Sequence, residues 1–552
     1  MARGTGETEV TAQKTMLPGL LVALATPLDD YVAAKDPNYG WFDTNNTVTF
    51  DLLRAKAHIL NVTSQQWLTT DKAIGPNGAL WTHQVAVAIP DKPRGSGTAV
   101  ALLTGGCNEG PPKPPDQHDE YLLIAATVAD MTGLIAIVVY QIPNCHIVYP
   151  SDPERKGRSE DAMIAWAWRE YVKDPAHDPK WLPRLPMVKA GMACMLAAEE
   201  FVATLGSVET AATAVAPISS WTVSGASKRG WTSWMVGAVA AGGMCAWCPK
   251  VSALAPLVPI VPYLNHSVHL QRQSLGGFTF AFSDYLDAGV LQLFDTPEFQ
   301  TGLALIEPAP NYIERLAKLP KMAVVSSDDE FMQLDWTQHG WATLPGETHL
   351  LVAPNSEHSL SSAIPELIPS LAAFIASVDA KEPPSARPQF SYAVDASSGA
   401  LTVTLPAGSP TPLKVVLRHA QTTSDKRRDF RWVRLANVSN GDHCTLPDFP
   451  LKKPLFGGNC VQPIAWEETE LTPNASASVG SVEGGGAAAP VVYTATPTPP
   501  KKGHWRGYYI ELKYASTQLK KAELRVSTPG FVWPNTLPFP DCDMSECPPV
   551  LL

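Results

Sequence analysis

Short apolar runs alternate with longer segments of helical periodicity between residues 95 and 380. These runs are continuous rather than alternating apolar and polar, which is the pattern of strands that are covered on both faces. Strands that alternate with helices form a mostly parallel sheet with right-handed crossovers, so this region predicts an α/β fold. The expected strands cover residues 98–104, 134–140, 221–223, 251–259, 322–325 and 349–353, and the clearest expected helices cover 160–172 and 188–204.

The pattern divides the chain into two expected domains. Residues 27–380 form the α/β domain, in which an aromatic-rich insert at about 264–320 separates two strands and fits a lid over a site. Residues 381–388 read KEPPSARP and predict a linker. Residues 389–552 carry short β-type runs separated by turn residues, which favours a β sandwich. Within it, the Ala/Ser/Gly/Pro-rich stretch 474–500 predicts a low-complexity loop.

The N-terminal segment and the cysteines bear on the compartment. We expect residues 1–26 to be a leader, because the apolar run 16–25 ends in Ala-Leu-Ala, as in a secretory signal with its cleavage site. Five glycosylation sequons and small Cys–Cys spacings, such as Cys542 with Cys547, also favour a secreted glycoprotein. No later run reaches 18 uninterrupted apolar residues, so we expect no membrane span. The sequons lie at Asn45, Asn61, Asn265, Asn437 and Asn474.

Composition narrows the function classes. The 552 residues include 42 Lys and Arg against 53 Asp and Glu, a net charge of −11. Binding of nucleic acid by bulk charge needs clustered cations, so we expect no nucleic-acid partner. Apolar residues make up 45%, enough for a sizeable core. The sequence implies neither a metal nor an organic cofactor.

The sharpest chemical signal is the segment 221–235, which reads WTVSGASKRGWTSWM. A β-type run enters a Gly-x-Ser turn and a helical pattern follows, which is the context of a nucleophile elbow. Ser227 is therefore the candidate nucleophile. The usual second glycine, two residues after the serine, is Arg229 here, and Gly230 comes one residue later. The alternative interpretation is an ordinary turn that leads into a helix.

Candidate partners of Ser227 follow in the chain order of an α/β-hydrolase, which is Ser, then an acid, then His. The acidic segment 328–330 comes directly after the strand expected at 322–325, and Asp328 or Asp329 can lie at its end. His358 lies in the loop after the strand at 349–353, where a neutral imidazole could accept the serine proton. The rival acids are Glu330 and Asp335, and the rival bases are His339 and His349.

Two backbone N–H groups are candidates for an oxyanion hole. Lys228 follows the nucleophile at a helix N-terminus, where its N–H would stabilise developing negative charge. Gly106 lies in a Gly-Gly loop after the first parallel strand, where backbone groups can approach a ligand closely. A flexible turn is the alternative interpretation of that loop.

Many phrases of this chain resemble the PhoPQ-activated pathogenicity-related protein family, which includes autocrine proliferation repressor proteins. The resemblance runs from about residue 27 to 540 and implies an α/β-hydrolase fold followed by a β domain. It implies Ser227 as nucleophile, Asp329 as acid and His358 as base, but no substrate. The segment 307–312 departs from the family, because it begins with Glu where Asp is expected. The phrases include PLDDYV at 27–32, TSQQW at 63–67, LWTH at 80–83, RSED at 158–161, LPMVK at 185–189, SGASKRGW at 224–231, GG at 276–277, DEF at 329–331, RDFR at 428–431 and LPF at 537–539.

Two functions compete at this point. The leading hypothesis is a serine hydrolase that cleaves an ester or peptide bond of a small substrate. The alternative is a secreted signalling or proliferation-repressor-like binding protein that has a cell-surface partner, with a hydrolase scaffold whose catalysis is dispensable. Aromatic residues in or beside the insert, Phe282 and Tyr285 among them, are candidates to line a substrate cleft. The acids at the start of the 160–172 helix, Glu160 and Asp161, fit helix capping better than substrate contact.

Overall fold

The structure is a computed structural model of the 552-residue chain. It describes residues 25–108, 110, 113–205, 215–435, 459–474, 489–547 and 550–552. The leader expected at 1–26 therefore lies almost entirely outside the described residues. The same holds for most of the loop expected at 474–500, for the sequon at Asn437 and for Cys444.

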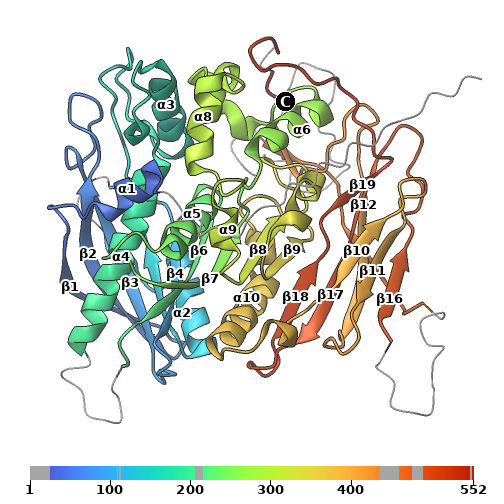
Figure 1. Cartoon of the computed structure of the whole chain (residues 1–552), viewed down its shortest axis with the longest axis horizontal. Helices are drawn as coiled ribbons and strands as arrows, with labels where there is room; N and C mark the ends of the chain where they lie inside the picture. Colours follow the sequence, from blue (N-terminus) through green and yellow to red (C-terminus); the bar gives the residue numbers. More distant parts are fainter. Residues whose placement is uncertain are drawn as a thin grey trace, which may run out of the picture.

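A nine-stranded sheet in the order β1-β2-β3-β5-β4-β6-β7-β8-β9 forms the first part of the chain (Figure 1). The strands β5, β4, β6, β7, β8 and β9 are parallel to one another, whereas β1, β2 and β3 form an antiparallel extension that pairs with β5. In the sheet, β5 lies between β3 and β4, so the spatial order of β4 and β5 is the reverse of their order in the chain. This strand order and the helices that cover the sheet give the α/β-hydrolase fold. The strands are β1 Gly40–Thr49, β2 Ala55–Gln66, β3 Leu80–Pro90, β4 Thr98–Leu103, β5 Ile135–Val139, β6 Ser220–Ala226, β7 Val251–Leu257, β8 Lys321–Ser326 and β9 Thr348–Ala353.

The parallel strands have the apolar composition that burial on both faces demands. All five residues of β5 and all six of β8 are buried, because helices pack against the sheet. The helix α10 passes a length and hydropathy test for a membrane span over Ser361–Asp379, but 56% of that window is buried within the described fold. The flanking helices are α1 Pro27–Ala33, α2 Glu120–Thr132, α4 Arg184–Leu205, α5 Lys228–Gly242 and α10 Ile364–Asp379.

The insert between β7 and β8 is a group of short helices that lies beyond the carboxyl ends of the parallel strands (Figure 1). The helix α3 (Glu160–Lys173), which lies outside the insert in the sequence, packs against helices of the insert. Glu307, the departure from the family phrase, accepts a 2.5 Å hydrogen bond from Leu264 N and so joins the end of α8 to the start of α6. The helices are α6 Leu264–Leu275, η2 Phe280–Phe282, α7 Ser283–Asp287, η3 Leu291–Leu293, α8 Pro297–Ile306 and α9 Ile313–Leu316.

After α10 the chain passes through η7 (Pro384–Ala386) and becomes antiparallel β structure. One sheet has the order β10-β11-β16, and a larger one has the order β15-β12-β17-β18, with β19 paired to β17. Their facing residues, such as Val403 and Ile510, share one apolar core, as in a sandwich. The strands are β10 Ser391–Val394, β11 Leu401–Leu405, β12 Lys414–Gln421, β13 Val433–Leu435, β14 Asn459–Val461, β15 Glu467–Glu470, β16 Val491–Ala495, β17 Arg506–Ala515, β18 Glu523–Ser527 and β19 Phe531–Trp533.

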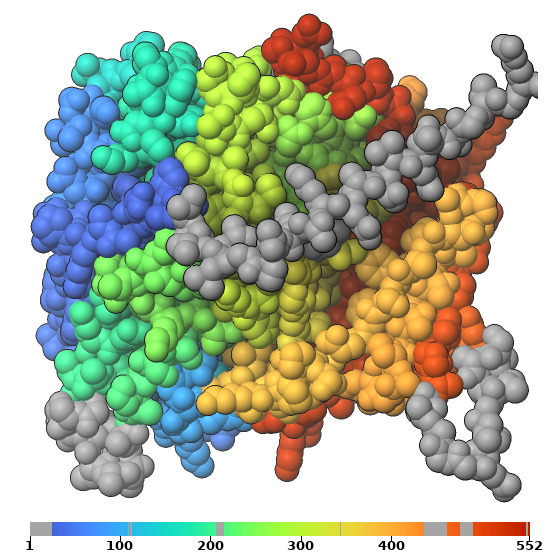
Figure 2. Space-filling view, in the orientation of Figure 1, coloured from blue at the N-terminus to red at the C-terminus, as the bar shows by residue number. Residues whose placement is uncertain are grey.

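The two parts share a buried junction. β18 packs against β9 and α10, and Ser527 Oγ accepts a 2.9 Å hydrogen bond from Val352 N. Arg428 of the β part forms a buried ion pair with Asp335 of the α/β part. Figure 2 shows orange and red residues of the β part directly against the yellow residues that end the α/β part. The sandwich is therefore an integral part of the fold and not a tethered module.

Three disulfides occur among the described residues. Cys107 is bonded to Cys145, Cys245 to Cys248, and Cys542 to Cys547. Cys194 lies buried in α4 as a free thiol, in agreement with its apolar surroundings in the sequence. The first bridge joins the loops that follow β4 and β5, so it fixes the loop that contains Gly106.

Candidate active site

Ser227 lies between β6 and α5, where the chain turns sharply from strand to helix. Its backbone has φ 57° and ψ −124°, a conformation that L-residues rarely adopt. Hydrogen bonds from Ser227 N to Leu257 O and from Trp231 N to Ser227 O, of 2.9 and 3.0 Å, hold the turn. This is the geometry of a nucleophile elbow, in which strain at one residue presents its side chain at the edge of the sheet.

The displaced glycine of the elbow motif has a steric explanation. A Cβ on Gly225 would lie 2.8 Å from Arg229 O, and a Cβ on Gly230 would lie 2.5 Å from Leu257 O and 3.0 Å from Gly225 O. Gly230 is therefore the position at which the first turn of α5 contacts β6 and β7. The glycine three residues after the serine permits this close packing, while Arg229 extends its side chain elsewhere.

His358 and Asp329 form the second half of the site. Asp329 follows β8 and His358 follows β9, so the parallel register brings them together. Both carboxylate oxygens of Asp329 lie 2.9 Å from His358 Nδ1. Asp329 also accepts hydrogen bonds from Ser326 Oγ at 2.8 Å and from Phe331 N at 2.8 Å. These donors orient the carboxylate, which in turn orients the imidazole.

Asp328, the alternative to Asp329, and the two rival acids have other partners. Asp328 accepts hydrogen bonds from Ser327 Oγ at 2.6 Å and from Trp466 Nε1 at 2.9 Å, and burial raises its pKa to about 7. Glu330 accepts a 3.0 Å hydrogen bond from His358 N rather than from the imidazole ring. Burial, and then the charge of Asp329, raise the pKa of Glu330 to about 8. Asp335 pairs with Arg428, as described above.

The two rival histidines do not line a cavity with Ser227, and each has another partner. The His339 ring stacks on His266 with ring centroids 4.0 Å apart, and His349 Nε2 lies 2.8 Å from Glu347 Oε1. Of the three candidate bases, His358 alone contacts a carboxylate at the end of β8.

Ser227 and His358 line one cavity of about 60 Å³. His358 Nε2 is buried and has no hydrogen-bond partner among the described residues. The atom that would accept the serine proton is therefore free, although no hydrogen bond to Ser227 is formed in this conformation. Apolar side chains of the insert and of α3 form the walls of the cavity. They are Ile164, Trp168, Ile260, Leu264, Val268, Phe282, Val290, Leu291, Phe294 and Phe299.

The oxyanion candidates differ in position. Lys228 is the first residue of α5 and lines the cavity. Gly106 has φ +105° and lies beside the Cys107–Cys145 bridge, with its carbonyl 3.3 Å from Cys145 Sγ. Gly106 does not contribute to the lining of the 60 Å³ cavity. Its predicted role therefore remains a prediction.

A charged network beside Ser227 was only partly anticipated from the sequence. Lys228 Nζ lies 2.7 Å from Asp161 Oδ2 and 3.0 Å from Glu160 Oε2, and Arg229 also pairs with Glu160. The N-cap side chain of α3 makes no capping hydrogen bond. The acids expected to cap α3 thus bind the two cations that follow the nucleophile. Among the aromatic candidates, Phe282 and Tyr285 line the cavity.

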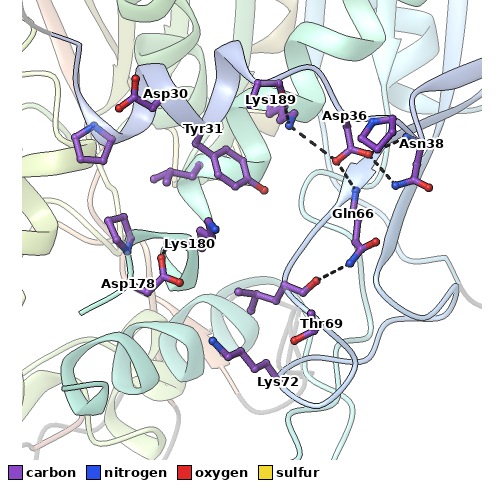
Figure 3. A pocket seen from close by; sticks show the side chains of 16 residues that line it. Asp30, Tyr31, Asp36, Asn38, Gln66, Thr69, Lys72, Asp178, Lys180 and Lys189 are labelled. Atoms are coloured by element: carbon purple, nitrogen blue, oxygen red, sulfur yellow. Dashed lines mark hydrogen bonds and ion pairs between the residues drawn. The ribbon is translucent and has the colours of Figure 1, made fainter. Parts of the chain in front are cut away.

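A larger hollow of about 700 Å³ lies elsewhere, between α1, the end of β2 and the start of α4 (Figure 3). Asp36 accepts hydrogen bonds there from Gln66 N at 3.0 Å and from Asn38 N at 2.9 Å. Lys189 Nζ donates to Ala34 O at 2.6 Å and lies 3.9 Å from Asp36. Asp36 is thus engaged with its neighbours, and none of the residues that line the Ser227 cavity lines this hollow.

Comparison with known proteins gives consistent relationships. Residues 28–431 match the family described as PhoPQ-activated pathogenicity-related protein. The chain is 31% identical over 529 residues to autocrine proliferation repressor protein A of Dictyostelium discoideum, covering 94% of this chain and 92% of that protein. Among solved structures, an acetyl xylan esterase from Paenibacillus sp. R4 aligns at 12% identity and a TM-score of 0.36, over 62% of this chain and 92% of the esterase. Acetyl xylan esterase 1 from Thermoanaerobacterium sp. JW/SL YS485 aligns at 14% identity and a TM-score of 0.36, over 64% and 93%. By the family match and the identity to the Dictyostelium protein, the chain belongs to the PhoPQ-activated pathogenicity-related protein family.

Proposed function

We propose that the protein is a serine hydrolase that cleaves an ester or peptide bond. Ser227 would be the nucleophile, His358 the general base and Asp329 the residue that orients His358. The observation that carries the proposal is the pairing of Asp329 with His358 Nδ1 at 2.9 Å, while the opposite nitrogen of the ring and the strained Ser227 share one cavity.

In this proposal, Nε2 of His358 is the nitrogen that moves the proton. Asp329 accepts from Nδ1–H, which leaves Nε2 as the acceptor for the Ser227 hydroxyl proton. Ser227 Oγ then attacks the substrate carbonyl carbon, and negative charge develops on the carbonyl oxygen. The backbone N–H groups of Lys228 and Gly106 are our candidates to stabilise that charge. His358 returns the proton to the departing alcohol or amine, and a water molecule then hydrolyses the acyl-enzyme by the same route.

The electrostatics of His358 suit a base that works near neutral pH. Burial lowers the pKa of the imidazole, but the charge and hydrogen bond of Asp329, aided by Glu330, outweigh burial and raise the pKa above its ordinary value. A raised pKa makes Nε2 a stronger proton acceptor. Contacts between a nucleophile and its base tighten when substrate binds, so a hydrogen bond between Ser227 and His358 Nε2 is expected in the substrate complex.

A fluorophosphonate probe tests the proposal directly, because it forms a covalent bond only with an activated serine. We expect labelling of the wild-type protein at Ser227, identified by peptide mass spectrometry, and no labelling of Ser227→Ala. The matched control is Ser233→Ala, two turns along α5, whose hydroxyl donates to Arg229 O at 2.8 Å outside the cavity. A folded wild-type sample that is not labelled would remove the proposal.

A second candidate function rests on a different observation. The related Dictyostelium protein is named an autocrine proliferation repressor, and the three disulfides among the described residues favour an oxidising compartment. We propose on these grounds a secreted protein, with a cell-surface partner as the alternative to a small substrate. Ser227→Ala separates the two functions. Full activity of that variant in a proliferation assay would favour signalling, and loss of activity would favour hydrolysis.

A further inference from the structure

Arg184, the first residue of α4, is a buried cation at the wall of the Ser227 cavity. Its side chain is only 4% exposed, and it lines the same cavity as Ser227 and His358. Nη1 donates to Lys228 O and, at 2.8 Å, to Thr232 Oγ1, and the guanidinium lies over the Trp231 ring at 4.3 Å. Because Lys228 directly follows the nucleophile, the guanidinium lies against the first turn of α5, next to the turn that holds Ser227.

The two carboxylates at the start of α3 are bound by cations other than this arginine. Lys228 pairs with Asp161 and Glu160, and Arg229 pairs with Glu160, so these two acids already have two cations. Within the described part of the chain, Arg184 forms no ion pair with a carboxylate, and its Nε has no hydrogen-bond partner. A buried charge without a counter-ion is costly, so such a group is expected where a ligand supplies the opposite charge.

Asp161 is the carboxylate whose charge acts on Arg184, but other groups bind both of its oxygens. Its Oδ1 accepts a 2.9 Å hydrogen bond from Tyr285 Oη, and its Oδ2 binds Lys228 at 2.7 Å. Burial lowers the pKa of Arg184 to about 9, and Asp161 offsets this only in part. The guanidinium therefore stays charged at neutral pH.

The shape of the cavity limits the body of such a ligand. Its walls are aromatic and aliphatic, as described above, and its volume of about 60 Å³ holds roughly four to six groups of water size. An enclosed space beside a nucleophile suits the acyl half of a substrate, because this half stays bonded to the serine after the leaving group has departed. A short apolar acyl chain that ends in an anion would fill the space between these walls and reach Arg184.

We propose that the substrate is an ester or amide whose acyl half is a short apolar chain bearing a carboxylate, and that Arg184 binds this carboxylate. This inference rests on the proposed function of Ser227. The planar guanidinium has the donor geometry that matches a carboxylate. The stacked Trp231 and the hydrogen bonds to α5 fix its orientation, so its role is recognition and not proton transfer.

Two esters that differ in one terminal group test the proposal. Monomethyl glutarate carries the carboxylate, and methyl 5-methylhexanoate replaces it with an isopropyl group of similar shape. Each hydrolysis consumes one water and releases methanol and a carboxylic acid, which a pH-stat measures. We expect the wild-type kcat/KM for the glutarate ester to exceed that for the neutral ester at least tenfold.

Variants then assign the preference to one side chain. Arg184→Met should lower the ratio of the two kcat/KM values at least tenfold, mainly through KM for the glutarate ester, and Arg184→Lys should retain part of it. The matched control is Arg169→Met, because Arg169 stacks on Trp166 at 4.5 Å but does not line the cavity. This control should leave the ratio unchanged. An unchanged ratio in folded Arg184→Met would overturn the inference and leave Arg184 a structural residue.

A binding measurement separates failure of this inference from failure of the proposed function. Calorimetric titration of Ser227→Ala with monomethyl glutarate needs no catalysis, and we expect binding that Arg184→Met, added to it, weakens at least tenfold. If fluorophosphonate fails to label Ser227 but this binding depends on Arg184, the hydrolase proposal falls and the carboxylate site stands. If Ser227 is labelled but neither binding nor the ester preference depends on Arg184, the carboxylate site falls and the hydrolase proposal stands.

Discussion

Glu330 offers a quantitative test of the electrostatics around His358. This glutamate is 3% exposed and its pKa is raised to about 8 by burial and then by the charge of Asp329, against an ordinary value of 4.5. An acid whose pKa is higher in the folded state than in the unfolded state favours folding least at high pH. Its cost is absent below pH 4.5, grows as pH rises, and levels off above about pH 8.

Glu330→Gln removes this cost, because the neutral amide keeps an oxygen that can accept from His358 N. Each pKa unit corresponds to about 1.4 kcal/mol, so the stability gained by the variant should increase by about 3 to 4 kcal/mol between pH 5 and pH 8. Because Glu330 is uncharged below about pH 8, the variant should keep the acid limb of the wild-type pH–rate profile.

Urea titrations followed by tryptophan fluorescence at pH 5, 6, 7 and 8 measure the difference in unfolding free energy between wild type and variant. Glu314→Gln, on the exposed side of α9, is the matched control and should show a difference that does not change with pH. A stability difference for Glu330→Gln that stays constant from pH 5 to pH 8 would refute the reasoning. It would mean that Glu330 has the same pKa in the folded and unfolded chain, as a hydrated carboxylate would.

Three further results are expected. Gly230→Ala introduces a Cβ 2.5 Å from Leu257 O, so it should cost about 1–3 kcal/mol of stability and slow fluorophosphonate labelling; a loss below that range with normal labelling would contradict the packing role of this glycine. Arg428→Met leaves Asp335 buried without its counter-ion and should cost about 3–5 kcal/mol in urea unfolding, and Asp335→Leu added to it should recover most of the loss. Since only the neutral His358 ring accepts a proton, kcat/KM should fall as pH drops through a midpoint above 6.5, and a midpoint below 6.5 would contradict the raised pKa.

One physical reason made the parallel part of the sheet predictable from the sequence, and with it the positions of the candidate site residues. A strand buried on both faces is a continuous apolar run, so β4, β5, β8 and β9 are visible in the sequence and their carboxyl ends are fixed to within a residue or two. Parallel neighbours place those ends at one edge of the sheet, and this makes the chain order of Ser227, Asp329 and His358 informative.

Other features depend on contacts between residues far apart in the sequence. The antiparallel extension β1–β3 has mixed polar and apolar positions, because β1 lies at the exposed edge of the sheet. The ion pairs of Glu160 and Asp161 join α3 to α5 across more than 60 residues, and a local pattern favoured capping instead. Arg184 sits in an apolar helix whose sequence gives no sign that the side chain turns toward Ser227. Each of these features is a property of tertiary packing.

The hydrogen bond between Trp466 and Asp328 connects the β part of the protein to the loop that holds the candidate acid Asp329. The indole of Trp466 donates a hydrogen bond to the carboxyl of Asp328, the residue directly before Asp329. Trp432 N donates to the backbone carbonyl of Asp328 at 3.2 Å. A protein cut at the linker would leave that carboxyl hydrated and free to ionise one peptide bond away from the candidate catalytic acid. The smallest unit in which Asp329 keeps its native electrostatic environment therefore includes the sandwich as well as the α/β part.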